Sequence, residues 1–199
     1  MNSLKALIMR SDIFLRTGIC VAVLSTAMPA AVSAAPFTVK VDGLDPQGRF
    51  ANGQVYDGFG CHGENVSPRI SWSHLPPGTK SIAVTIHDPD APTDGLGWTH
   101  WNVVNIPVSA TAIEKGASGN ARLLPAGALE TMTDFGASKY GGPCPPQGES
   151  HRYIVTVSAL GVPNIDVNAA SSPALVAYQM HGNVIARAKS VAKYRRTPE

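Results

Sequence analysis

The stretch TKSIAVTIHDPDAPTDGLGWTHWNVVNIP, residues 79–107, holds two β-strand patterns separated by a turn rich in Asp, Pro and Gly. Residues 80–87 alternate apolar and polar side chains at period two, and residues 101–106 are rich in β-branched side chains. Two carboxylates, Asp88 and Asp90, directly follow the first of these patterns. The stretch therefore predicts two neighbouring strands with acidic groups where the first one ends.

Three further segments have strand character. Residues 37–41, 69–72 and 153–160 are short runs of apolar and β-branched residues bounded by Gly, Pro or polar turns. Residues 45–68 are rich in Gly, Asn and Pro, which is typical of a loop with short β pieces. Most of the chain therefore reads as β-structure.

The C-terminal region has a different pattern. Ser171, Ser172 and Pro173 offer a helix N-cap followed by proline at the first helical position. Apolar residues then recur at intervals of three and four, as on an amphipathic helix: Leu175, Val176, Met180, Val184, Ile185, Ala188 and Val191. Gly182 interrupts this run and can divide it into two shorter helices. We expect a mostly β (β+α) domain with an antiparallel sheet and a C-terminal helix packed on it.

The first 34 residues resemble a secretory signal peptide. A basic start is followed by an uncharged apolar run and a small-x-small sequence, with cleavage expected after Ala34. The competing interpretation is an uncleaved membrane anchor, but the apolar run is shorter than the ~20 residues of a spanning helix. We therefore expect a single domain over residues 35–199, exported to the periplasm or secreted, with no stable membrane insertion after cleavage.

Removing this leader changes the charge of the protein. The chain has 16 Lys and Arg against 14 Asp and Glu, of which the leader holds three and one, so 13 of each remain. The only basic cluster left is Arg195-Arg196 at the C-terminal end. A nucleic-acid partner is therefore not expected.

Two cysteines remain after Cys20 is removed with the leader, namely Cys61 and Cys144. In an oxidising compartment an even count favours a disulfide between them. The alternative is two buried free thiols, because the sequence alone does not show whether the two Cβ atoms meet.

Four segments occur in a recognisable order: TKSIAVTIHDPDAP (79–92), GWTHWNVVNIP (97–107), TDFGASKYGGPCPPQGESHRYIVTVSAL (133–160) and GNVIARAKSVAKY (182–194). Together they resemble the phosphatidylethanolamine-binding protein family, and more narrowly its bacterial branch of Raf kinase inhibitor-like proteins. The DPDAP, GxxHW, GGPCPP and HRY motifs are highly specific in combination, and the resemblance covers nearly all of residues 37–194.

The resemblance implies a large central antiparallel sheet, a second smaller sheet and a small anion-binding pocket at one end. No metal or cofactor is implied. Carried over motif by motif, the implied ligand-binding residues are Asp88, Asp90, His100, Gly142, Pro143, Cys144, His151 and Tyr153.

The chain departs from the family pattern at two positions. Thr133 stands where the family commonly has Asn before the Asp-Phe/Tyr-Gly segment, and Asn183 stands where it commonly has His after Gly. The second departure puts in doubt any role that a C-terminal histidine plays at the rim of the pocket.

The chemistry of these residues suits a ligand that carries both a negative and a positive charge. His100 and His151 can donate ring N–H groups to an anion, Tyr153 can donate its hydroxyl, and a Gly-rich turn can offer backbone N–H groups. One of Asp88 and Asp90 would orient an imidazole, and the other would face a cationic part of the ligand. We therefore expect a non-enzymatic protein that binds a small anion or a phosphorylated, zwitterionic head group.

Other functions remain open. A metal site would need the His and Asp residues to converge, and no HxxxH or CxxC spacing arranges them. A hydrolase would use Cys144 or a His/Asp pair in the same pocket, although no GxSxG motif is present. The resemblance also implies inhibition or regulation of a protein partner, and a homodimer.

Overall fold

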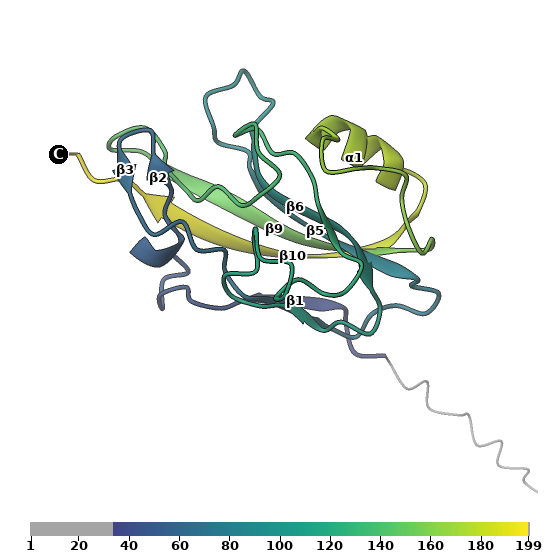
Figure 1. Cartoon of the computed structure of the whole chain (residues 1–199). Helices are drawn as coiled ribbons and strands as arrows, with labels where there is room; N and C mark the ends of the chain where they lie inside the picture. The colour runs from purple at the N-terminus through teal and green to yellow at the C-terminus, as the bar shows by residue number, and fades with distance from the viewer. Residues whose placement is uncertain (1–33, 199) are drawn as a thin grey trace, which may run out of the picture. The chain divides into compact units, whose positions relative to one another are not determined.

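The computed structural model describes residues 34–198 (Figure 1). The residues from Ala35 onward form one unit. The expected leader, residues 1–34, falls outside the described residues except for Ala34. Among residues 34–198, no helix has the length and apolarity needed to span a bilayer.

The largest element is a five-stranded antiparallel sheet. Its strand order is β10-β9-β5-β6-β8, and every neighbouring pair is antiparallel. The strands are β5 (Ser81–Asp88), β6 (Trp98–Pro107), β8 (Leu129–Glu130), β9 (Ser150–Leu160) and β10 (Val184–Arg195). The large antiparallel sheet expected from the alternating segments is confirmed.

A smaller sheet packs against one face of the large one. It has three strands in the order β1-β4-β7, with bounds β1 (Thr38–Val41), β4 (Ile70–Ser73) and β7 (Ala112–Ile113). Ile70 and Trp72 of the small sheet belong to the same buried cluster as Ile82, Val84 and Val155 of the large sheet. The main hydrophobic core therefore lies between the two sheets, and the expected second sheet is confirmed.

A short hairpin and a single helical turn precede β4. The hairpin pairs β2 (Asp57–Gly58) with β3 (Cys61–His62), and the 3-10 turn η1 covers Asn52–Gln54. These elements contribute little to the core, but they form part of the surroundings of the site described below.

One α-helix covers the opposite face of the large sheet (Figure 1). The helix α1 (Pro173–Met180) begins as expected, because Ser172 accepts a hydrogen bond from the backbone N–H of Leu175 and Pro173 occupies the first helical position. It buries Val176 and Met180 against a second apolar cluster on the sheet. The prediction of a helix packed on the sheet is therefore confirmed over these residues.

The predicted helix does not continue beyond Gly182. This glycine has a φ of +81°, a left-handed conformation that ends the helix. Residues 184–195 then form β10, which pairs with β9 along its whole length. The helical prediction for Val184, Ile185, Ala188 and Val191 is wrong, because pairing with the open edge of β9 outweighs the weak three- and four-residue spacing.

Candidate functional site

A hollow of about 340 Å³ lies at one end of the large sheet, where β5 ends and β6 and β9 begin. Four polar side chains from these strands line it, together with apolar side chains from the strand ends and neighbouring loops. The polar set is Asp88, His100, His151 and Tyr153, and the apolar set includes Phe59, Pro92, Trp98, Phe135, Pro145 and Pro146.

Strand alternation brings three of these polar residues to the face that carries the core. Along β5, Asp88 continues the inward-facing series that includes Val84 and Ile86. Along β9, His151 and Tyr153 precede Val155 on the same face. The hollow is therefore the polar end of the surface that forms the hydrophobic core farther along the sheet.

A β-bulge places His100 beside them. The β5–β6 register runs from Ile86 opposite Trp101 to His87 opposite Thr99, which leaves His100 as the extra residue. His100 and Trp101 are both almost completely buried, although they are consecutive in sequence. The bulge therefore aims His100 at the hollow while Trp101 stays in the core.

His100 is held as a neutral imidazole. Its Nδ1–H donates to the carbonyl oxygen of Gly141 at 2.6 Å, and burial lowers its pKa to about 4. The neutral ring with a proton on Nδ1 carries a lone pair on Nε2. This nitrogen can therefore accept a hydrogen bond, in contrast to the donor role expected from the sequence.

His151 lies between two carboxylates. Its Nδ1 is 2.7 Å from Asp88 Oδ2, and its Nε2 is 3.1 Å from Glu149 Oε2. Burial alone would lower its pKa, but the hydrogen bonds with Asp88 and Glu149 outweigh burial and leave the pKa raised. His151 therefore holds its proton more tightly than a free imidazole, and in its protonated form it donates from Nδ1 to Asp88 and from Nε2 to Glu149.

Tyr153 presents an unpartnered hydroxyl. The residue is completely buried, and its Oη makes no hydrogen bond to any described residue. Burial raises its pKa well above the usual value, so the phenol keeps its proton. A buried hydroxyl without a partner is uncommon in folded proteins, and this one lines a hollow large enough for a ligand.

Three of the predicted ligand-binding residues do not line the hollow. Asp90 accepts two hydrogen bonds from the Arg152 guanidinium and one from its backbone N–H, and its pKa falls to about 2, chiefly through the Arg152 side chain. Asp90 is thus occupied by Arg152 and does not face a ligand cation. Arg152 itself does not line the hollow and is engaged in this salt bridge.

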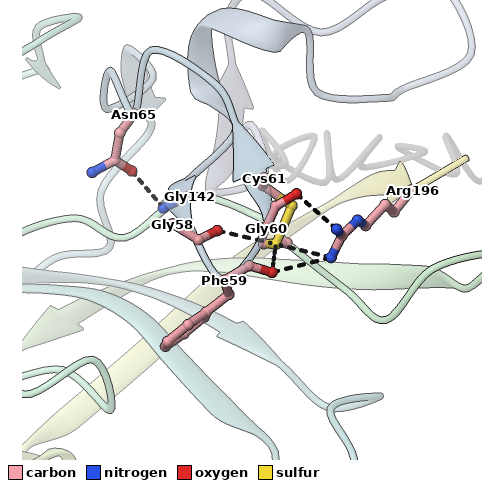
Figure 2. The surroundings of a disulfide bond; sticks show 8 residues. Gly58, Phe59, Gly60, Cys61, Asn65, Gly142 and Arg196 are labelled. Carbon is pink, nitrogen blue, oxygen red and sulfur yellow. Dashed lines mark hydrogen bonds between the residues drawn. A yellow bond between two sulfur atoms is a disulfide. The ribbon is translucent and has the colours of Figure 1, made fainter. Parts of the chain in front are cut away.

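Gly142 and Pro143 bind other parts of the protein. The N–H of Gly142 donates to the side-chain oxygen of Asn65 at 2.8 Å (Figure 2), and the Pro143 carbonyl accepts from Tyr56. A Cβ on Gly142 would lie 2.0 Å from the Gln54 carbonyl oxygen, so glycine is required for close packing. The N–H group of Gly142 is therefore engaged by Asn65, and it does not supply the anion-binding donor that we expected from this turn.

A disulfide joins Cys61 to Cys144 (Figure 2). The sequence left open a disulfide or two free thiols, and the structure has the disulfide. The bridge ties β3 to the loop that follows Gly142, and Cys144 lines the hollow. Beside it, the Arg196 guanidinium donates to the carbonyls of Phe59 and Gly60. Because the sulfur of Cys144 is bonded to Cys61, it is not available as a nucleophilic thiolate in this structure.

No group of three or more His, Cys, Asp or Glu side chains within residues 34–198 has an arrangement that would hold a metal ion. Several lining residues were not among the predicted ones, including Phe59, Phe135 and Pro145 on the wall and Arg196 at the C-terminal end. Glu149, which contacts His151, was also missed. Its spacing of two residues from His151 on a strand was the available signal.

The chain has clear relatives of known sequence. A profile described as "Phosphatidylethanolamine-binding protein" matches residues 46–195. UPF0098 protein YbhB of Escherichia coli (strain K12) is 45% identical over 140 residues, which cover 70% of this chain and 88% of YbhB. UPF0098 protein YbcL of the same strain is 44% identical over 163 residues, covering 81% of this chain and 88% of YbcL.

A solved structure shares the fold as well. The crystal structure of E. coli YbcL, described as a new member of the mammalian PEBP family, superposes with a TM-score of 0.77 at 43% identity. The match covers 81% of this chain and 99% of the YbcL chain. Sequence and fold therefore agree, and this chain belongs to the phosphatidylethanolamine-binding protein family.

Proposed function

We propose that this chain is an exported, non-enzymatic binding protein whose hollow takes a phosphorylated or zwitterionic head group. Export is supported by the signal-like order of residues 1–34 and by the disulfide, which persists in oxidising compartments. Family membership supports a binding role. The chemistry of the polar residues narrows the class of ligand.

The hydrogen-bonding groups of the hollow match a singly protonated phosphate. Tyr153 offers an O–H donor, and His151 offers an N–H donor from Nε2 when Glu149 moves aside. His100 offers an acceptor at Nε2, which suits the remaining P–OH group. A phosphate monoester carries all three complementary groups on one tetrahedral centre.

The apolar wall suits the rest of such a ligand. Phe59 and Phe135 stack with their ring centroids 5.9 Å apart, and Trp98 packs edge-on against Phe135. Phe59 is 68% exposed although it is aromatic, so it offers contact surface to an organic substituent. A head group or a phosphorylated side chain of a protein partner would present the same chemistry to this wall.

The unpartnered, fully buried hydroxyl of Tyr153 is the observation that carries this proposal. It is tested by titrating inorganic phosphate and phosphoethanolamine into the purified protein by calorimetry at neutral pH. Tyr153→Phe removes one hydrogen-bond donor, so we expect affinity to fall about tenfold. Its stability should be unchanged or higher, because the variant no longer buries an unsatisfied hydroxyl.

The matched control is Tyr140→Phe. Tyr140 is also buried, but its hydroxyl donates to the Gln54 carbonyl and it does not line the hollow. This variant should lose about 1 kcal/mol of stability and bind both ligands like the wild type. Equal affinity of wild type and Tyr153→Phe, or no binding by the wild type, would contradict the proposal.

A further inference from the structure

Glu149 competes with any ligand for the donor of His151. Its Oε2 lies 3.1 Å from His151 Nε2, and this is the nitrogen that does not bind Asp88. An anion that binds His151 through Nε2 has to displace the Glu149 carboxylate or share one proton with it. The Nε2 donor of His151 is therefore already engaged by a side chain of the same protein.

The Glu149 side chain is able to move while its backbone stays in place. Its backbone N–H donates to the Pro146 carbonyl, and its own carbonyl accepts from the backbone N–H of Arg196. The side chain is 56% exposed, and the hydrogen bond that it makes within residues 34–198 is to His151. Rotation about the side-chain bonds can thus free His151 without disturbing the β9–β10 edge.

The charges around His151 make this movement depend on the ligand. Asp88 and Glu149 place two carboxylates beside the one imidazole of His151, while Asp90 is paired with Arg152 and the Arg196 guanidinium, which also lines the hollow, is held by the hairpin carbonyls. A purely anionic ligand meets the repulsion of the displaced carboxylate. A ligand that also carries an ammonium group can pair with that carboxylate instead.

We propose that Glu149 is the specificity-determining residue of the hollow, and that it selects zwitterionic over purely anionic phosphate ligands. It does so by competing with the phosphate for His151 and by receiving the cationic group of the ligand. This assignment rests on the proposed function. It also gives the counter-cation role, which Asp90 cannot fill, to the carboxylate that contacts His151.

The proposal is tested by comparing two ligands on three proteins. Calorimetry measures the affinities of phosphoethanolamine and inorganic phosphate for the wild type, Glu149→Gln and Glu114→Gln. Glu114 is a matched control because its side chain is 55% exposed and pairs with Arg69 away from the hollow. Thermal melting of each protein confirms that the fold is retained, and Glu149→Ala provides a second variant.

The wild type and the control should prefer phosphoethanolamine. In Glu149→Gln the ratio of the phosphoethanolamine affinity to the phosphate affinity should fall about tenfold. Phosphate should bind more tightly than to the wild type, and phosphoethanolamine less tightly. An unchanged ratio in both Glu149 variants, with measurable binding, overturns the role of Glu149 and leaves the proposed function standing. Absence of binding by the wild type and by both variants overturns the proposed function itself.

Discussion

The two ends of one sheet face differ sharply although the same three strands build both. At one end β5, β6 and β9 present Ile82, Val103 and Val157 to a dry core. At the other end the same strands present Asp88, His100 and His151 to a hollow. The alternation of β5 and β9 is the same at both ends, a bulge in β6 adds His100 to the hollow, and what changes is the chemistry of the inward-facing residues.

The covering layer differs as well. The core end is closed by the small sheet, whose Ile70 and Trp72 fill the space above the strands. The hollow is bordered by loop segments, including those that carry Phe59 and Pro145, and the disulfide between Cys61 and Cys144 joins two of them. Alternation, together with the β6 bulge, thus decides which side chains face inward, and the covering layer decides whether they are packed or left accessible.

The core end should respond to truncation with the largest loss of stability. Ile82 is fully buried and lies six residues before Asp88 on β5. Ile82→Ala removes packed methyl groups and leaves a cavity, so we expect the free energy of unfolding in urea to fall by about 2–5 kcal/mol. Phosphoethanolamine affinity should stay within about twofold of the wild type. A large loss of affinity at retained fold would show that the two ends are not independent.

The disulfide should affect both stability and binding. Replacing Cys61 and Cys144 together by alanine removes a cross-link between residues 83 apart, which typically contributes about 2–4 kcal/mol. Because the bridge also holds the wall of the hollow, phosphoethanolamine affinity should fall several-fold.

Reduction of the wild-type protein with dithiothreitol serves as the comparison for the double variant. The two should share a lower urea midpoint and a weaker affinity. A midpoint unchanged by complete reduction would show that the loops of the hollow are held by their hydrogen bonds alone.

The smallest effect concerns the two histidines, whose pKa values move in opposite directions. The pKa of His151 is raised, so its stabilisation is fully present below 6.5 and is lost as the pH rises through its folded-state pKa. The pKa of His100 is lowered to about 4, so protonation favours the unfolded chain as the pH falls from 6.5 toward 4. Between pH 6.5 and 5 we expect His100 to reduce stability by about 1–2 kcal/mol.

Ring resonances followed by NMR provide the measurement. His151 should remain protonated above pH 6.5, whereas His100 should stay neutral until the pH approaches 4. His100→Asn should remove the loss of stability between pH 6.5 and 5. Similar titration midpoints for the two rings would contradict the different environments described above.

The sequence predicted the strands well because their alternation is local and strong. It failed at β10, where helical spacing competed with a period-two pattern that was also present: Arg187, Lys189, Lys193 and Arg195 recur at even intervals and are exposed. Which of the two patterns prevails depends on whether the edge of β9 is open for pairing. The residues of β9 lie far from β10 in the sequence, so no local stretch of sequence around β10 reveals this edge.

The site was predicted only in part, for similar reasons. The motifs placed Asp88, His151 and Tyr153 together because strand ends meet there. The partner of Asp90 depends on the position of Arg152 on the neighbouring strand β9, and the direction of His100 depends on a bulge in the β5–β6 pairing. Both features depend on the register in which neighbouring strands pair, and the sequence alone predicts this register poorly.

The position of β10 at the margin of the large sheet has a consequence for self-association. An unpaired outer strand invites addition of a strand from a second molecule, a common route to fibrils and unintended dimers. Here residues 48–50 already hydrogen-bond to Lys193 of that strand, and its outward residues are mostly cationic. Like charges would oppose each other in any such pairing, so a homodimer of this protein would have to assemble through a different surface.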